Sequence, residues 1–202
     1  GIRDYKVTGV QTCALPISKE ADLNIAMTAA TFGAVGTAGQ RCTTTRRLII
    51  HEKIYNKFKD KLAHAYKQLK IGNPLNEKNH VGPLIDKDAV AMYLNAIEKC
   101  KAEGGKFIVE GGVIKGKGYE SGCYVKPCIA EAKNSFEIVQ HETFAPILYI
   151  MKYKTIQEAI ALQNGVPQGL SSSIITNNLQ EAEYFLDRKS TRLNSSHLVI
   201  SY

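Results

Sequence analysis

Apolar residues recur along the chain at two spacings, and these spacings predict alternating helices and strands. A three-to-four-residue spacing follows Asp22, whose side chain can cap a helix that runs to about Val35. Further helices are predicted at 54–69, 156–162 and 179–186, with another that ends at Gly104–Gly105 and turns Val90, Tyr93, Leu94 and Ile97 inward. Short apolar runs predict strands at 48–50, 107–109, 124–129, 136–139, 147–151 and 173–176. This alternation indicates an α/β fold with a largely parallel sheet, in which sites form at the carboxyl ends of the strands.

Both ends of the chain depart from this pattern. Residues 7–18 (VTGVQTCALPIS) and 187–197 (DRKSTRLNSSH) resemble the conceptual translation of sequencing-adapter DNA. We therefore predict that residues 1–18 and 187–202 are foreign segments and that the genuine domain spans 19–186. The alternative is a divergent but real terminus. Foreign segments were never selected to pack and should be loosely attached, so burial of Leu15 and Ile17 would contradict the prediction.

Charge and composition exclude several classes of protein. Lys and Arg number 26 against 19 Asp and Glu, and the two end segments carry part of the +7 net charge. The lysines are spread along predicted helix faces without interleaved aromatic residues, which argues against a nucleic-acid partner. No apolar run approaches the 18 residues that would indicate a membrane span.

Cysteine usage points to free thiols. No C-x-x-C pair is present and no histidine has finger-like spacing, so we expect no metal site. Free thiols predict a reducing, cytoplasmic compartment. The cysteines are Cys13, Cys42, Cys100, Cys123 and Cys128.

One cysteine stands in an unusual setting. Cys42 follows a glycine-rich turn and precedes a predicted strand, within the stretch 32–47 (FGAVGTAGQRCTTTRR). Glycine permits a sharp turn and a close approach to a ligand. Cationic neighbours raise the thiolate fraction of a cysteine, and Arg41, Arg46 and Arg47 are near in sequence. Cys42 is thus a candidate nucleophile, and a small buried apolar residue is the alternative.

Two motifs resemble the signatures of the NAD(P)-dependent aldehyde dehydrogenase superfamily. Residues 39–42 (GQRC) resemble its cysteine signature, and residues 142–146 (ETFAP) resemble its E-x-F-x-P element. The details at 37–44, 142–149 and 168–174 are most similar to the aminoadipic semialdehyde dehydrogenase (antiquitin) branch. The resemblance implies the catalytic domain of that fold, NAD as cofactor, a small-molecule aldehyde as substrate, a role in lysine catabolism and a homotetrameric parent protein.

The resemblance also implies roles for four residues. Cys42 would attack the aldehyde to give a thiohemiacetal, its oxyanion held in part by the Cys42 backbone N–H, and a thioester would follow. Thr43 would contact the substrate. Glu142 would hydrogen-bond the nicotinamide ribose and Phe144 would pack near the ring. The alternatives are a solvated carboxylate at the end of a strand for Glu142 and a core aromatic residue for Phe144. Arg47 is predicted to brace the loop.

The resemblance further implies parts that this chain does not supply. The general base of the family is a Glu in an E-L-G-G element, and its position falls near Thr8. The pyrophosphate-binding turn belongs to a separate cofactor domain. We therefore expect the chain as given to be inactive. Two other classes remain open, a non-catalytic α/β module with a structural Cys42 and a thiol hydrolase. A hydrolase would need a histidine to activate Cys42, and neither His51 nor His141 is identified as one.

Overall fold

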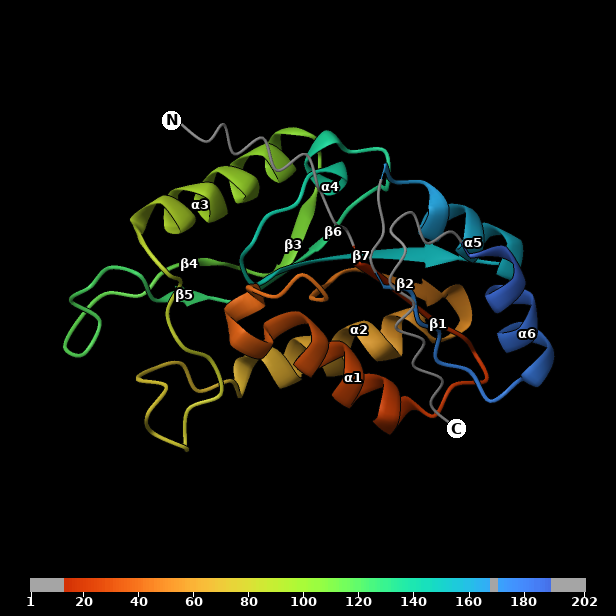
Figure 1. Cartoon of the computed structure of the whole chain (residues 1–202), viewed down its shortest axis with the longest axis horizontal. Coiled ribbons are helices and arrows are strands. Elements are labelled where there is room, and N and C mark those ends of the chain that lie inside the picture. The colour runs from red at the N-terminus through yellow and green to blue at the C-terminus, as the bar shows by residue number, and fades with distance from the viewer. Residues whose placement is uncertain (1–12, 168–170, 190–202) are drawn as a thin grey trace, which may run out of the picture.

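A five-stranded sheet forms the centre of the computed structural model, which describes residues 13–167 and 171–189 (Figure 1). The strand order is β1-β2-β7-β6-β3. The first four strands run parallel to their neighbours, and β3 pairs antiparallel with β6. This confirms the predicted α/β class with a largely parallel sheet. The strands are β1 (Cys13–Ile17), β2 (Thr45–His51), β3 (Lys106–Val109), β6 (Cys128–Glu131) and β7 (Ile147–Tyr153).

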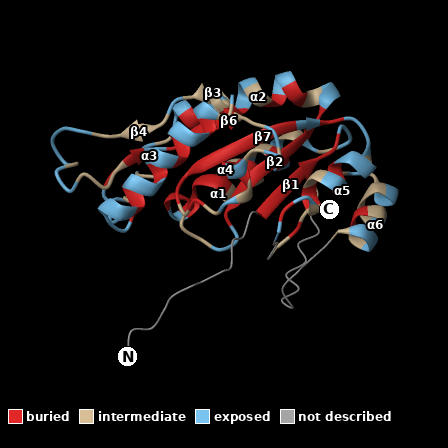
Figure 2. Cartoon of the chain, turned by 90° about the horizontal axis from the view of Figure 1, so that it is seen from above, coloured by how far each residue is buried: buried red, intermediate tan, exposed pale blue. Residues whose placement is uncertain are grey.

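Helices cover both faces of this sheet. In Figure 1, α1 and α2 lie below the sheet, whereas α3, α4 and α5 lie above it. Every residue of β1 and β2 is buried, as expected for parallel strands between two helical layers (Figure 2). The helices are α1 (Leu23–Val35), α2 (Glu52–Lys67), α3 (Lys87–Ala102), α4 (Glu137–Gln140), α5 (Ile156–Asn164) and α6 (Leu179–Arg188).

Local sequence explains where α1 begins, and the short helix that follows α1 leads to Cys42. The Asp22 carboxylate accepts hydrogen bonds from the backbone N–H groups of Asn24 and Ile25, which confirms the predicted cap. At its other end α1 passes into the short 3₁₀ helix η1 (Gly36–Gly39).

Outside the main sheet, β4 (Gly112–Val113) and β5 (Val125–Lys126) form a two-stranded antiparallel pair.

Three predictions about elements are wrong. Residues 136–139 lie mostly in helix α4, because the Glu103 carboxylate receives the N–H groups of Glu137 and Ile138 and so stabilises a helix start. Residues 173–176 form no strand; isolated bridges join Ser172 and Ile175 to β1. Leu94 is 37% exposed and does not face inward.

The expected loose attachment of the leader is also wrong for residues 13–18. Leu15 is 5% exposed and Ile17 is fully buried, and they pair with Leu48 and Ile50 of β2. The apolar run CALPI suits an extended strand beside β2, and burying a side chain such as Leu or Ile contributes roughly 1.5–3 kcal/mol. At the other end, α6 continues to Arg188, past the predicted boundary at 186. Residues 1–12 and 190–202 lie outside the described residues.

Candidate active site

The predicted nucleophile lies in a strained turn between α1 and β2. Residues 36–44, the cysteine turn, contain three consecutive positive φ angles: 56° at Thr37, 53° at Ala38 and 71° at Gly39. Left-handed backbone is costly for residues with a side chain, so its persistence here means that surrounding contacts hold it. The turn leaves the free thiol of Cys42 exposed, with Thr43 exposed beside it. The structure therefore favours an accessible Cys42 over a buried apolar one.

Gly39 brings the cysteine turn against a second loop. Residues 141–146, the glutamate loop, connect α4 to β7 and carry Glu142 and Phe144. A Cβ atom added to Gly39 would lie 2.4 Å from the carbonyl oxygen of Ala145 and 2.7 Å from the nitrogen of Pro146. Only glycine permits this approach. The two sequence motifs, a hundred residues apart, therefore meet in space.

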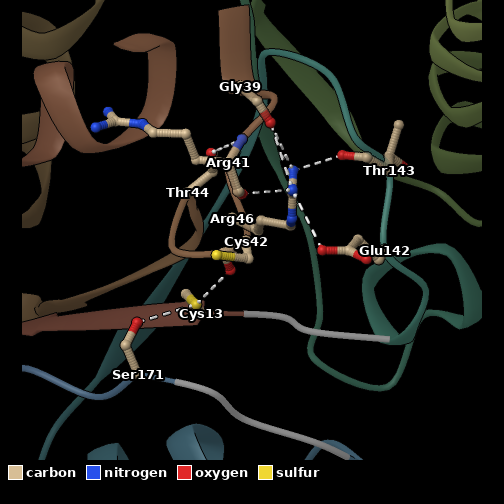
Figure 3. A network of polar contacts seen from close by, with 9 residues as sticks. All are labelled: Cys13, Gly39, Arg41, Cys42, Thr44, Arg46, Glu142, Thr143 and Ser171. Carbon is tan, nitrogen blue, oxygen red and sulfur yellow. Dashed lines mark hydrogen bonds and ion pairs between the residues drawn. The ribbon is translucent and has the colours of Figure 1, made fainter. Parts of the chain in front are cut away.

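Arg46 links the same two loops through hydrogen bonds (Figure 3). Its guanidinium group reaches the carbonyl oxygens of Gly39 and Arg41, each at 3.4 Å, and that of Thr143. It also forms an ion pair of 3.5 Å with the Glu142 carboxylate. Arg46 was given no such role in the sequence analysis. No local pattern in the sequence indicated this role, because the acceptors of the glutamate loop lie about a hundred positions away.

Arg41 and Arg47 donate hydrogen bonds to backbone carbonyl oxygens, a role that their nearness to Cys42 in the sequence did not predict. Arg41 extends over the ring of Phe32, 5.0 Å from its centroid, and donates to the Phe32 carbonyl oxygen. Arg47 is fully buried and donates to Asn134 Oδ1 at 2.8 Å and to the carbonyl oxygen of Gln163 at 3.0 Å. Arg47 is therefore structural, as predicted, but it braces α5 and the segment after β6.

Burial sets the electrostatics of the glutamate loop. Burial raises the pKa of Glu142 above its usual range, and the charge and hydrogen bond of Arg46 oppose that shift. Burial lowers the pKa of Arg46, with Glu142 as the main opposing influence. Burial also lowers the pKa of Arg47 to about 10. The Arg46–Glu142 pair is thus held in a partly desolvated environment where each charge depends on the other.

Strand β1 supports the cysteine turn. The Cys13 thiol donates to the Cys42 carbonyl oxygen at 3.4 Å and lies 3.2 Å from Ser171 Oγ. Cys13 had been assigned to the foreign leader, so sequence reasoning gave it no part in the site. Figure 3 shows it directly beside Cys42.

We expect Cys42 to be the thiol most reactive toward alkylation. Burial raises the pKa of Cys100 to about 11 and that of Cys128 to about 12, so both remain thiols near neutrality. Cys13 is buried, and Cys123 is only half-exposed. Brief iodoacetamide treatment followed by peptide mass mapping should find Cys42 modified first, with labelling in urea as the control for all five sites. Preferential labelling of Cys128 would count against Cys42 as the reactive residue.

Comparison with known proteins identifies the family. The profile of the aldehyde dehydrogenase family matches residues 12–192. This chain belongs to the aldehyde dehydrogenase family. It is 48% identical over 163 residues to aldehyde dehydrogenase family 7 member A1 of Pisum sativum, covering 81% of this chain and 31% of that protein. It is 46% identical over 162 residues to the alpha-aminoadipic semialdehyde dehydrogenase of Rattus norvegicus, covering 80% of this chain and 29% of that protein.

Solved structures share the fold. Betaine aldehyde dehydrogenase of Staphylococcus aureus, solved in complex with NAD⁺, is 25% identical with a TM-score of 0.86, covering 91% of this chain and 36% of that chain. HpcC of Thermus thermophilus is 29% identical with a TM-score of 0.84, at the same coverage of 91% and 36%. The chain thus spans about a third of the length of these relatives. The roles of Cys42, Thr43, Glu142 and Phe144 stay predictions.

The described residues offer few features of other site types. They contain no group of three or more His, Cys, Asp or Glu side chains placed to hold a metal ion. Across 13–167 and 171–189, no helix combines the length and apolar character that crossing a membrane requires. A groove of about 580 Å³ lies between α1 and α2 and is lined by residues that include Phe32, Thr37 and Leu69, with Cys42 not among them.

Proposed function

We propose that the protein to which this chain belongs oxidises an aldehyde to a carboxylate with NAD, using Cys42 as the nucleophile. The observation that carries the proposal is the contact between the cysteine turn and the glutamate loop, made by Gly39 and Arg46. A nucleophile and a cofactor-binding carboxylate must stand side by side if both are to act on one substrate. The aldehyde we propose is aminoadipic semialdehyde, because the Rattus norvegicus relative carries that name.

Cys42 can perform the covalent steps from its place in the turn. Its exposed thiolate would add to the aldehyde carbon to form a thiohemiacetal, and its own backbone N–H would help to hold the oxyanion. Loss of hydride would leave a thioester on Cys42, which water then hydrolyses. Thr43, exposed next to it, would contact the substrate. A related structure, betaine aldehyde dehydrogenase of Staphylococcus aureus, holds a cysteine modified by β-mercaptoethanol.

The glutamate loop fits part of a nicotinamide cofactor. The Glu142 side chain is 22% exposed and its carboxylate has acceptor capacity beyond its ion pair with Arg46, as a ribose diol requires. Phe144 is half-exposed and stacks with Arg46 on one side, 5.2 Å from the ring centroid to the guanidinium carbon. When bound, NAD would accept the hydride. The Glu142 and Phe144 side chains would hold the ribose and fix the position of the ring.

We propose that the parent protein is a cytoplasmic homotetramer that acts in lysine catabolism. Helix α1 supports self-association, because its thirteen residues contain no charged side chain and it exposes Ile25 and Phe32, the latter at 65%.

The chain as given is proposed to be inactive alone, and this supplies the test. A cofactor domain contributes binding energy from the phosphates and adenosine, and a general base contributes a factor on the order of 10² to 10⁴. We define the completed enzyme as residues 19–186 placed between the remaining segments of a full-length relative. It should form NADH from aminoadipic semialdehyde, whereas the 202-residue chain should not.

Each alternative function corresponds to a distinct result. A folded completed enzyme that binds NAD but forms no NADH would refute the roles of Cys42, Glu142 and Phe144 and favour a non-catalytic module. Turnover by the chain alone would refute our account of what it needs. Hydrolysis of an acyl ester without any cofactor, in the absence of aldehyde oxidation, would favour a thiol hydrolase.

A further inference from the structure

We propose that Arg46 is a positioning residue that holds Cys42 and Glu142 in register by fastening the cysteine turn to the glutamate loop. The relevance of this role to catalysis rests on the proposed function. The role itself rests on geometry, and it concerns a residue to which the sequence motifs assign nothing.

The contacts of Arg46 divide between the two loops. On the side of the cysteine turn, Nη1 and Nη2 both donate to the Gly39 carbonyl oxygen at 3.4 Å, and Nη2 also donates to that of Arg41. On the side of the glutamate loop, Nη1 donates to the Thr143 carbonyl oxygen and Nη2 pairs with the Glu142 carboxylate. A planar fork of donors is suited to serving several acceptors at fixed angles, which a lysine ammonium cannot reproduce.

Burial of the Arg46 side chain makes the loss of any of these contacts costly in free energy. The Arg46 side chain is 2% exposed, so its charge must be satisfied by the groups around it. Those groups are the backbone of the cysteine turn, the backbone of the glutamate loop, the Glu142 carboxylate and the Phe144 ring. Displacement of either loop would leave buried donors without acceptors, which is costly. The guanidinium group therefore fixes the distance between the loops.

Comparison with the neighbouring Arg47 shows that the link between the two loops is specific to position 46. Side chains alternate between the two faces of a strand, so Arg46 and Arg47 of β2 point to opposite sides. Arg47 is equally buried and donates to Asn134 and to α5 carbonyl oxygens, including that of Gln163. Arg47 thus provides a matched control: the same residue type, the same strand and similar burial, with its described hydrogen bonds made to Asn134, Leu162 and Gln163 and to neither of the two loops.

A substitution of Glu142 should therefore also alter the cysteine turn that carries Cys42. Glu142 is the acidic partner of the guanidinium group that also holds the carbonyl oxygens of Gly39 and Arg41, which precede Cys42 in the cysteine turn. Replacing the carboxylate by a neutral amide weakens its hold on Arg46, because charge-assisted hydrogen bonds are roughly twice as strong as neutral ones. The cysteine turn should then open more often, although it lies in a different segment of the chain.

Native-state hydrogen exchange on the 202-residue chain tests the proposal. Arg46→Met should speed amide exchange at residues 40–44 and 142–145 on the order of tenfold, which is the effect of losing one strong hydrogen bond. Arg47→Met should lower the urea midpoint without this selective change at the two loops. Glu142→Gln should speed exchange at residues 40–44 by about fivefold, and the iodoacetamide labelling rate of Cys42 should change with it.

Arg46→Lys covers the case in which Arg46→Met does not fold. It should show the same local acceleration at both loops, to a smaller extent, because charge is kept and the fork is lost. Equal local acceleration in the Arg46 and Arg47 variants would overturn the proposal, as would wild-type exchange at both loops in Arg46→Lys. So would an unchanged cysteine turn in Glu142→Gln. None of these readouts requires turnover, so a silent completed enzyme would refute the proposed function and leave the role of Arg46 standing.

Discussion

Replacing Cys42 by alanine is expected to reduce NADH formation by the completed enzyme by a factor on the order of 10⁴ or more. Removal of a nucleophile abolishes the covalent route, and only background chemistry remains. The effect should fall on kcat, because Glu142 and Phe144 would still hold the cofactor. Initial rates at saturating aldehyde and NAD measure it.

Cys123→Ala is the control for this substitution. Cys123 is a half-exposed free thiol whose Sγ donates to the Ser121 carbonyl oxygen at 3.6 Å, in a loop that carries none of the proposed machinery. Its replacement should leave the rate close to that of the parent enzyme. Substantial turnover by Cys42→Ala, or equal losses in the two variants, would contradict the assignment of Cys42.

Gly39→Ala is expected to lower the free energy of unfolding of this chain by about 3 kcal/mol or more. Two effects combine. A residue with a side chain at φ 71° carries roughly 1–3 kcal/mol of strain, and the new Cβ would lie 2.4 Å from the Ala145 carbonyl oxygen, which forces the two loops apart at roughly 1–3 kcal/mol more. With a urea slope of about 2 kcal/mol per M, the unfolding midpoint should fall by about 1.5 M.

Gly118→Ala separates the two effects. Gly118 also has a positive φ, 91°, but a Cβ there would meet no atom within 4 Å. This control should cost only about 1–2 kcal/mol, from backbone strain alone. If the two substitutions lowered the midpoint equally, the close contact between the cysteine turn and the glutamate loop would not exist in solution.

Local rules in the sequence predicted much of the architecture. The Asp22 cap and the apolar spacing after it correctly placed α1, because both signals are contained within the helix itself. The buried runs at 48–50 and 147–151 correctly marked the central strands β2 and β7. The wrong assignment at 136–139 has the opposite cause, since that helix begins where Glu103, distant in sequence, receives its first N–H groups.

The sequence predicted which residues belong to the candidate site better than it predicted how those residues are arranged in space. The glycine-rich setting and the resemblance to family motifs singled out Cys42, the resemblance alone singled out Glu142, and the fold brings their loops together. Proximity in sequence suggested that arginines would surround the thiol, yet strand alternation sends Arg46 and Arg47 to opposite sides of β2. The role of Arg46 depends on the carbonyl oxygen of Thr143, 97 positions away, and no local pattern encodes that contact.

The segment at 13–18 shows how composition can mislead about packing. Its string of residues indicated a foreign leader, but an edge strand needs only backbone groups to pair and apolar side chains to bury. Leu15 and Ile17 meet both needs beside β2. Their burial is the result that contradicts a foreign leader, so the assignment of residues 13–18 to a foreign segment is wrong by that criterion.

Acid quenching of the completed enzyme during turnover tests the central claim most directly. The thioester predicted on Cys42 would survive in acid, and peptide mass mapping would detect an acyl group on the peptide that contains Cys42. The account predicts that this adduct forms only when both aldehyde and NAD are present and that it is lost in Cys42→Ala. Continued NADH formation with the acyl group on another residue, or with no protein adduct under conditions where hydrolysis limits the rate, would contradict it.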